Sequence, residues 1–173
     1  MNNMVNKKNG PDKKKHILVI SQYFFPEQFR VNELCLEWKK RGYRVTVLTG
    51  MPNYPKGKIY PGYSWRKSRH DNYKGIEVIR LPVIPMGSHM TSLAFNYISY
   101  SVLGVIWALF SSLKPDYVFT YAMSPLTQAF VSIAVAKKCG IKHYLYIQDL
   151  WPDSVYDTIN IKNCFIRKTL YNM

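Results

Sequence analysis

A short apolar run directly after a group of lysines constrains the fold of this chain most. Residues 17–21 are mostly β-branched and apolar, which is typical of a strand buried on both faces of a parallel sheet. A loop follows, and apolar residues then recur three, four and seven positions after Val31, the spacing of a helix with one packed face. Gly42 is placed to end that helix before a second apolar run. Strand, helix and strand in this order predict the first half of a doubly wound α/β sheet.

The same alternation continues along the chain. Strands are expected at residues 17–21, 43–49, 76–81, 117–121 and 143–147, with a short edge piece at 65–69 and a turn at 72–75. Helices are expected at residues 30–41, 91–113, 124–139 and 160–171. Ser124 is expected to cap its helix, with Pro125 at the first helical position. The predicted fold class is therefore α/β: a Rossmann-like, doubly wound, mostly parallel sheet flanked by helices.

The expected helix at residues 91–113 has no charged side chain and is long enough to span a bilayer, which takes about 20 apolar residues. It also contains several Ser, Asn and Tyr residues, and a span at this place would split a single sheet. Three alternatives remain. The favoured one is a helix packed across the sheet; the others are a packed helix whose outer face lies in a membrane interface, and a membrane span.

The charge of the chain points to an anionic partner. The net charge is +14, and residues 39–69 contain Lys and Arg but no Asp or Glu. Nucleic acid, acidic membrane lipid or a phosphorylated substrate would each suit such a surface. The alternative is a solvated basic surface that has no such partner.

Cysteine usage and the amino-terminal residues favour a cytoplasmic location. Cys35, Cys139 and Cys164 lie in helical patterns without metal-ligand spacing, and are expected to be buried thiols in a reducing compartment. Residues 1–15 are polar and basic, lack the apolar core of a secretory signal, and are expected to form a disordered tail. Residues 16–173 are expected to form one domain.

Ligands of such a sheet bind where strands give way to helices, at the carboxyl edge. Of the loops expected there, those at 51–60 and 148–153 have the most unusual sequences. The chain has no Gly-x-Gly-x-x-Gly fingerprint, no phosphate-binding loop, no Gly-x-Ser-x-Gly elbow and no His pair with zinc spacing. A self-contained catalytic set is therefore missing, which favours half of a site over a whole one.

Several of these pieces together resemble one known family in their order and spacing. They are residues 17–27 with Arg30, residues 45–50, Pro52-Asn53-Tyr54-Pro55 with Gly57-Lys58, residues 60–63, Ser124-Pro125 and Asp149-Leu150-Trp151-Pro152. They resemble the amino-terminal domain of glycosyltransferase family 4 enzymes across about residues 16–170. They are most similar to the subgroup that builds bacterial O-antigen and capsule sugars on a lipid carrier. The first loop departs from the family pattern, because Gln28-Phe29 stands where many relatives have glycines.

The resemblance implies one half of a GT-B fold. In that family the amino-terminal domain holds the acceptor, and a carboxyl-terminal domain, which this chain does not match, binds the nucleotide-sugar donor. The implied function is the acceptor-binding half of a retaining glycosyltransferase that moves a hexose or N-acetylhexosamine to a lipid-linked or glycan acceptor. The chain is then expected to sit in the cytoplasm or peripherally on the inner face of the membrane. Without a donor domain, it is expected to bind acceptor weakly and transfer nothing.

Two candidate residues lie in the last matched loop. Asp149 would hydrogen-bond an acceptor hydroxyl or act as a base toward it, or else cap the following turn. Trp151 would stack on a sugar ring, or else pack in the core. No nucleophile, metal ion or cofactor is expected, and the catalytic residues are not assigned.

The other candidate substrate-binding residues lie in three earlier loops. Asn53 and Tyr54 stand between two prolines, which lower the entropy lost when a binding loop is fixed. Lys56 would supply charge to a diphosphate, or else be a solvated surface residue. Arg30 would meet phosphate or pair with a nearby Glu. Ser124 would cap a helix whose amides could also receive an anion.

Three other functions compete with this one. A non-catalytic accessory subunit would pair with a separate donor-binding chain. A basic nucleic-acid-binding module would explain residues 39–69 and the Tyr content, but not the order of strands and helices; no nucleic acid is therefore expected. A complete small Rossmann enzyme, such as a nucleotide-sugar oxidoreductase, is disfavoured by the missing glycine fingerprint.

Overall fold

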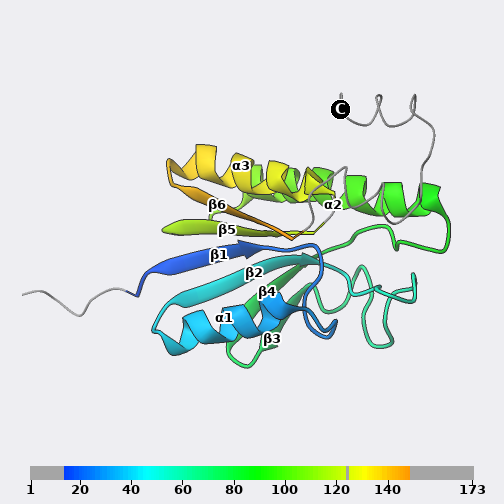
Figure 1. The fold of residues 1–173 in the computed structure, drawn as a ribbon, viewed down its shortest axis with the longest axis horizontal. Helices are drawn as coiled ribbons and strands as arrows, with labels where there is room; N and C mark the ends of the chain where they lie inside the picture. Colours follow the sequence, from blue (N-terminus) through cyan, green and yellow to red (C-terminus); the bar gives the residue numbers. More distant parts are fainter. Residues whose placement is uncertain (1–13, 124, 149–173) are drawn as a thin grey trace, which may run out of the picture.

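A computed structural model describes residues 14–123 and 125–148 as one six-stranded sheet with helices on both faces (Figure 1). The strands are β1 (His16–Ile20), β2 (Arg44–Gly50), β3 (His70–Tyr73), β4 (Ile76–Leu81), β5 (Tyr117–Ala122) and β6 (His143–Ile147). The helices are α1 (Arg30–Lys40), α2 (Met90–Phe110), the short η1 (Leu126–Gln128) and α3 (Ala129–Cys139). The predicted Rossmann-like α/β fold is confirmed.

The order of the strands places a switch point at β1. The sheet runs β3-β4-β2-β1-β5-β6, and every pair is parallel except β3 with β4. The chain winds outward from β1 in one direction through β2 and β4, and in the other through β5 and β6. Figure 1 shows α1 on one face of the sheet and α2 with α3 on the other. In such sheets the crevice beside the carboxyl ends at the switch point is where ligands bind.

The strand predicted to be buried on both faces is so in the structure. Every residue of β1 is buried, and its side chains alternate between two cores. Leu18 and Ile20 pack in the core beneath α2 and α3, with Tyr100 of α2. Val19 packs in the core beneath α1, with Cys35. Cys35 is thus a buried thiol as expected, Cys139 is half-buried, and Cys164 lies outside the described residues.

The edge strand lies later in the chain than the sequence analysis placed it. Residues 65–69 form no strand; β3 occupies His70–Tyr73 and pairs antiparallel with β4. The turn between them consists of Lys74 and Gly75, both with positive φ. Such a two-residue turn suits the twist of a hairpin, so it draws the residues before it into the ladder.

The helix expected at 124–139 begins differently. Pro125 is extended, with φ −83° and ψ 166°, so the prediction that it takes the first helical position is wrong. η1 begins after it, and α3 then runs to Cys139, with Gly140 in the left-handed region as its end. Residues 1–13 of the expected tail, the cap at Ser124 and the helix at 160–171 fall on residues that the structure does not describe.

The uncharged segment forms a helix packed across the sheet, as both packed-helix alternatives require. By length and composition alone α2 could cross a membrane. Here it connects β4 to β5, and its Tyr100 hydroxyl donates a hydrogen bond of 2.9 Å to the Leu48 carbonyl of β2. Gly104 lets α2 approach α3 closely, because a Cβ there would lie 2.5 Å from a Val131 methyl group.

Candidate functional site

The loops after β1 and β2 meet at a buried carboxylate. Glu27 is 3% exposed, and its Oε1 accepts hydrogen bonds from the backbone N–H groups of Asn53 (2.8 Å) and Tyr54 (2.7 Å). Its Oε2 accepts a longer bond of 3.3 Å from the N–H of Phe24. One side chain therefore fixes the loop after β1 (the first loop) to the loop after β2 (the second loop).

Asn53 joins the second loop to the third loop, which follows β4. Its side chain is 1% exposed; Nδ2 donates to the Met51 carbonyl (2.8 Å) and Oδ1 accepts from the Met86 N–H (2.9 Å). In this structure the Asn53 side chain positions the loops. The expected contact with an acceptor stays a prediction.

Two glycines add to the contact between the second and third loops. The Gly87 N–H donates to the Gly57 carbonyl at 3.0 Å, and the Gly57 N–H donates to the Asn53 carbonyl at 2.8 Å. A Cβ on Gly57 would lie 2.2 Å from the Gly87 carbonyl oxygen, so only glycine fits there. The loops after β1, β2 and β4 therefore form one cross-bonded unit.

Tyr54 is the candidate residue that this unit presents to solvent. Its side chain is 41% exposed, and its ring centroid lies 5.5 Å from that of Tyr23 and 5.3 Å from that of Phe29. Neighbouring aromatic rings fix one edge of Tyr54 and leave the rest open. Lys56 is exposed two residues further on, in the same loop.

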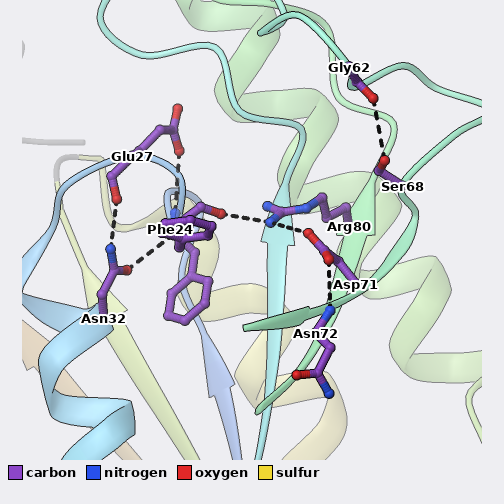
Figure 2. A network of polar contacts seen from close by, with 9 residues as sticks. Phe24, Glu27, Asn32, Gly62, Ser68, Asp71, Asn72 and Arg80 are labelled. Carbon is purple, nitrogen blue, oxygen red and sulfur yellow. Dashed lines mark hydrogen bonds and ion pairs between the residues drawn. The ribbon is translucent and has the colours of Figure 1, made fainter. Parts of the chain in front are cut away.

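A buried arginine holds the first loop to the sheet (Figure 2). Arg80 of β4 is 1% exposed, and its Nη2 donates to the Phe25 carbonyl (2.7 Å) and to Asp71 Oδ2 (3.2 Å). The guanidinium also lies over the Tyr63 ring, 5.0 Å from its centroid. Its Nε and Nη1 have no hydrogen-bond partner in the structure. Arg80 thus contributes a fixed positive charge near Glu27.

The first loop is also tied back to α1 by an amide. Asn32 Nδ2 donates to the Glu27 carbonyl at 2.7 Å, and its Oδ1 accepts from the Phe25 N–H at 3.2 Å (Figure 2). These two bonds fold residues 25–27 into a tight turn ahead of the helix. The Glu27 side chain is thereby aimed at the second loop.

A second buried polar cluster lies on the α2 side of the switch point. Gln22 Nε2 donates to Asn96 Oδ1 (2.6 Å), and the Gln22 N–H donates to Gln128 Oε1 (3.1 Å). All three side chains are buried. Hydrogen-bonded buried amides favour one arrangement, so the loop after β1 is held against α2 and η1.

Glu27 titrates near neutrality because it is buried. Burial raises its pKa from 4.5 to about 7; the three backbone N–H donors and the charge of Arg80 oppose that rise. Around neutral pH the carboxyl group that joins the two loops is therefore partly protonated.

This shift makes stability depend on pH. At Glu27 the folded state binds a proton more tightly than the unfolded state, so the contribution of this group to stability is greatest below pH 4.5 and falls as pH rises toward 7. We expect the free energy of unfolding to drop by up to about 3 kcal/mol over this window. Urea denaturation at several pH values, compared with Glu27→Gln to subtract all other titrating groups, measures it. Equal slopes for both proteins would contradict the prediction.

Of the other candidate residues, Arg30 lies in the described part of the chain. Arg30 begins α1 and is exposed; it lines a groove of about 700 Å³ on the α1 face with Trp38, Phe119 and Tyr146. Of the two acidic residues near Arg30 in sequence, Glu27 and Glu33, the carboxylate of Glu27 accepts from backbone N–H groups. Ser124, Asp149 and Trp151 lie outside the described residues.

Gln148 marks where the Asp149 loop begins. Its N–H donates to the Ala122 carbonyl at 2.9 Å, and its Oε1 accepts from the Tyr121 hydroxyl at 3.0 Å. β2 and β6 are three strand positions apart, about 14 Å. Residue 148 thus stands at the same edge of the sheet as the Tyr54 loop.

Sequence reasoning missed Glu27 and Arg80 as members of the site. The sequence offered a signal for Arg80, because it is a charged residue in the otherwise apolar end of β4. The signal for Glu27 was weaker: it is the acidic residue of the loop after β1. In the described part of the chain, no group of three or more His, Cys, Asp or Glu could hold a metal ion.

Comparisons with known proteins support the fold. No protein-family model and no curated protein matches the chain. Among solved structures, it is similar to the carboxyl-terminal domain of a hydrogenase from Pyrococcus furiosus, with a TM-score of 0.52, 23% identity, and coverage of 79% of this chain and 95% of that one. A second crystal structure of that domain gives a TM-score of 0.51, 22% identity, and coverage of 80% and 97%. These likenesses show a Rossmann-like α/β domain.

Proposed function

We propose that this chain is the acceptor-binding half of a retaining glycosyltransferase of family 4, one half of a GT-B fold. It would help to move a sugar from a nucleotide-sugar to a lipid-linked glycan in cell-surface polysaccharide synthesis. The donor would bind to a carboxyl-terminal domain or to a separate chain. No metal ion or cofactor enters the proposal, and the proposed location is the inner face of the cytoplasmic membrane.

One observation carries the proposal: the motif residues that resemble the family bond to one another. Glu27, Asn53 and Gly57 belong to two separate matched motifs, and together they form the cross-bonded unit at the carboxyl edge. Residues that merely matched by chance would have no reason to share one hydrogen-bonded cluster. This unit leaves Tyr54 open, and an aromatic face is a suitable platform for a sugar ring.

The roles of the site residues follow from where they lie. Tyr54 would stack on the acceptor sugar, and Lys56 would attract its diphosphate. Asp149 and Trp151 keep the roles that the resemblance implies, in a loop that starts at the same edge. In such a reaction most of the rate comes from positioning and charge stabilisation, which a fixed loop unit can provide.

Acceptor binding tests the role of Tyr54. With a polyprenyl-diphosphate-linked N-acetylhexosamine in detergent as probe, titration calorimetry should detect binding by the unmodified chain. Tyr54→Ala should weaken it about tenfold through loss of stacking, and Tyr54→Phe should leave it nearly unchanged. Since Tyr54 is exposed, both variants should fold normally. Absence of binding to hexose- and N-acetylhexosamine-linked probes alike, or sugar transfer by the chain alone, would overturn the proposal.

A further inference from the structure

α2 buries several polar side chains and exposes large apolar ones. Its polar residues Asn96, Tyr100 and Ser101 are buried against the protein. Asn96 bonds to Gln22, and Tyr100 to the Leu48 carbonyl, so these polar groups are satisfied inside. A helix on the surface of a soluble domain normally shows the opposite arrangement.

The outward face of α2 is almost entirely apolar. Six large side chains there are between 47% and 85% exposed: Phe95, Ile98, Val102, Ile106, Leu109 and Phe110. At 3.6 residues per turn they lie within about a third of the helix circumference, from Phe95 to the carboxyl end of α2. We call these six residues the apolar strip. Phe130 of α3, the neighbouring helix on the same face of the sheet, is 60% exposed as well.

Lysines flank both ends of the apolar strip. At the amino end, Lys56 and Lys58 are exposed in the loop that Gly57 ties to Gly87, just ahead of α2. At the carboxyl end, Lys138 donates to the carbonyls of Ala108 and Leu109, and Lys114 and Lys137 are exposed nearby in sequence to the ends of α2 and α3.

Acidic side chains are scarce around this surface. Between residues 82 and 148 the sequence has a single Asp or Glu, Asp116, which lies before β5 and pairs with Lys15. An apolar face with cationic ends and few anions is the composition of a helix that lies in the plane of an anionic bilayer. Two copies packed strip to strip would bring like charges together, which disfavours a dimer.

We propose that the apolar strip docks this domain on an anionic membrane surface, with α2 lying in the interface. The strip inserts among the acyl chains and the flanking lysines meet the headgroups. Because the Gly57–Gly87 contact joins the Tyr54 loop to the start of α2, docking brings the candidate site to the bilayer. This surface extends the proposed function to a lipid-linked acceptor, but membrane binding itself requires no sugar transfer.

Vesicle co-sedimentation of the full chain tests the docking surface. We expect binding to phosphatidylcholine vesicles that contain phosphatidylglycerol, and weaker binding as salt increases. Ile98→Ser combined with Ile106→Ser should weaken binding at least about tenfold. Lys114→Gln and Lys137→Gln should each weaken it roughly fivefold, on anionic vesicles alone. All four positions are exposed, so the variants should keep the fold.

Tyr144→Ser with Tyr146→Ser is the matched control, because these exposed aromatic residues of β6 contact Tyr117 and Phe119, which pack on the α1 side. It should bind vesicles as the unmodified chain does. Failure of the unmodified chain to bind vesicles would overturn the proposal, as would equal binding by the Ile98/Ile106 variant. A dimer that this variant dissociates, without vesicle binding, would likewise overturn it and assign the strip to a protein interface. None of these results depends on acceptor binding, so the two proposals fail separately.

Discussion

Replacing Glu27 by Ala is expected to destabilise the chain by about 3–4 kcal/mol at pH 5. The substitution leaves the buried N–H group of Asn53 and the partly buried N–H group of Tyr54 without an acceptor, and each such group costs about 1–3 kcal/mol when buried. The loss of the side chain adds a small cavity. The free energy of unfolding from urea denaturation measures the total.

The cost should shrink at pH 8. There the unmodified protein holds an ionised, buried carboxylate, whose unfavourable desolvation the Ala variant no longer has. Glu27→Gln separates charge from hydrogen bonding, because the Gln oxygen can still accept from both Asn53 and Tyr54. We expect Gln to be better tolerated than Ala at every pH. An Ala cost that is equal at pH 5 and pH 8 would show that ionisation of Glu27 does not matter.

Loss of Glu27 should also release the second loop. Hydrogen exchange of the Tyr54 and Gly57 amides is expected to accelerate in Glu27→Ala well beyond that of the β1 amides, since the loop loses its link to residues 24–27. Uniform acceleration across the sheet would instead indicate global destabilisation only.

The fold followed from the sequence because its signals are local and periodic. The β-branched run of β1, the apolar spacing of α1 and the glycines at 42 and 140 each act through neighbouring residues. Their alternation is nearly sufficient to define a parallel sheet. The edge strand was misplaced because its limits depend on pairing across the Lys74-Gly75 turn, which propensity alone does not locate.

The candidate site was only partly accessible to the same reasoning. The sequence indicated which loops lie at the carboxyl edge, but not which side chains point outward. Asn53 and Tyr54 are adjacent, yet one is enclosed by Met51 and Met86 while the other is open to solvent. That difference comes from tertiary hydrogen bonds. Glu27 and Arg80 were missed for the same reason, since their partners lie 26–27 and 55 positions away.

The polarity of α2 illustrates a further limit. The Ser, Asn and Tyr residues in residues 91–113 argued against a membrane span, because polar side chains are costly in lipid. The structure turns three of them, Asn96, Tyr100 and Ser101, toward the protein. What remains outside is more apolar than the average of the segment. Composition alone gives that average and does not show which residues lie on the exposed face of α2.

Arg80 provides the second large effect. Arg80→Ala is expected to cost about 3–5 kcal/mol, because it removes a fully buried side chain from β4 and leaves the Phe25 carbonyl without its donor. Asp71 loses its ion pair but is about one-third exposed, so water compensates most of that loss. Urea denaturation at pH 7 measures this change in the free energy of unfolding.

Arg80→Met distinguishes packing from charge. Met keeps most of the volume, while it removes a guanidinium whose Nε and Nη1 are buried without partners. We expect Met to recover more than half of the Ala cost, because the desolvation of the cation offsets much of what its two hydrogen bonds contribute. Met and Ala variants of equal stability would mean that the Phe25 bond, rather than packing, holds the first loop in place. Since Arg80 also lowers the pKa of Glu27, the Met variant should protonate Glu27 at higher pH, which would shift the pH dependence of stability upward.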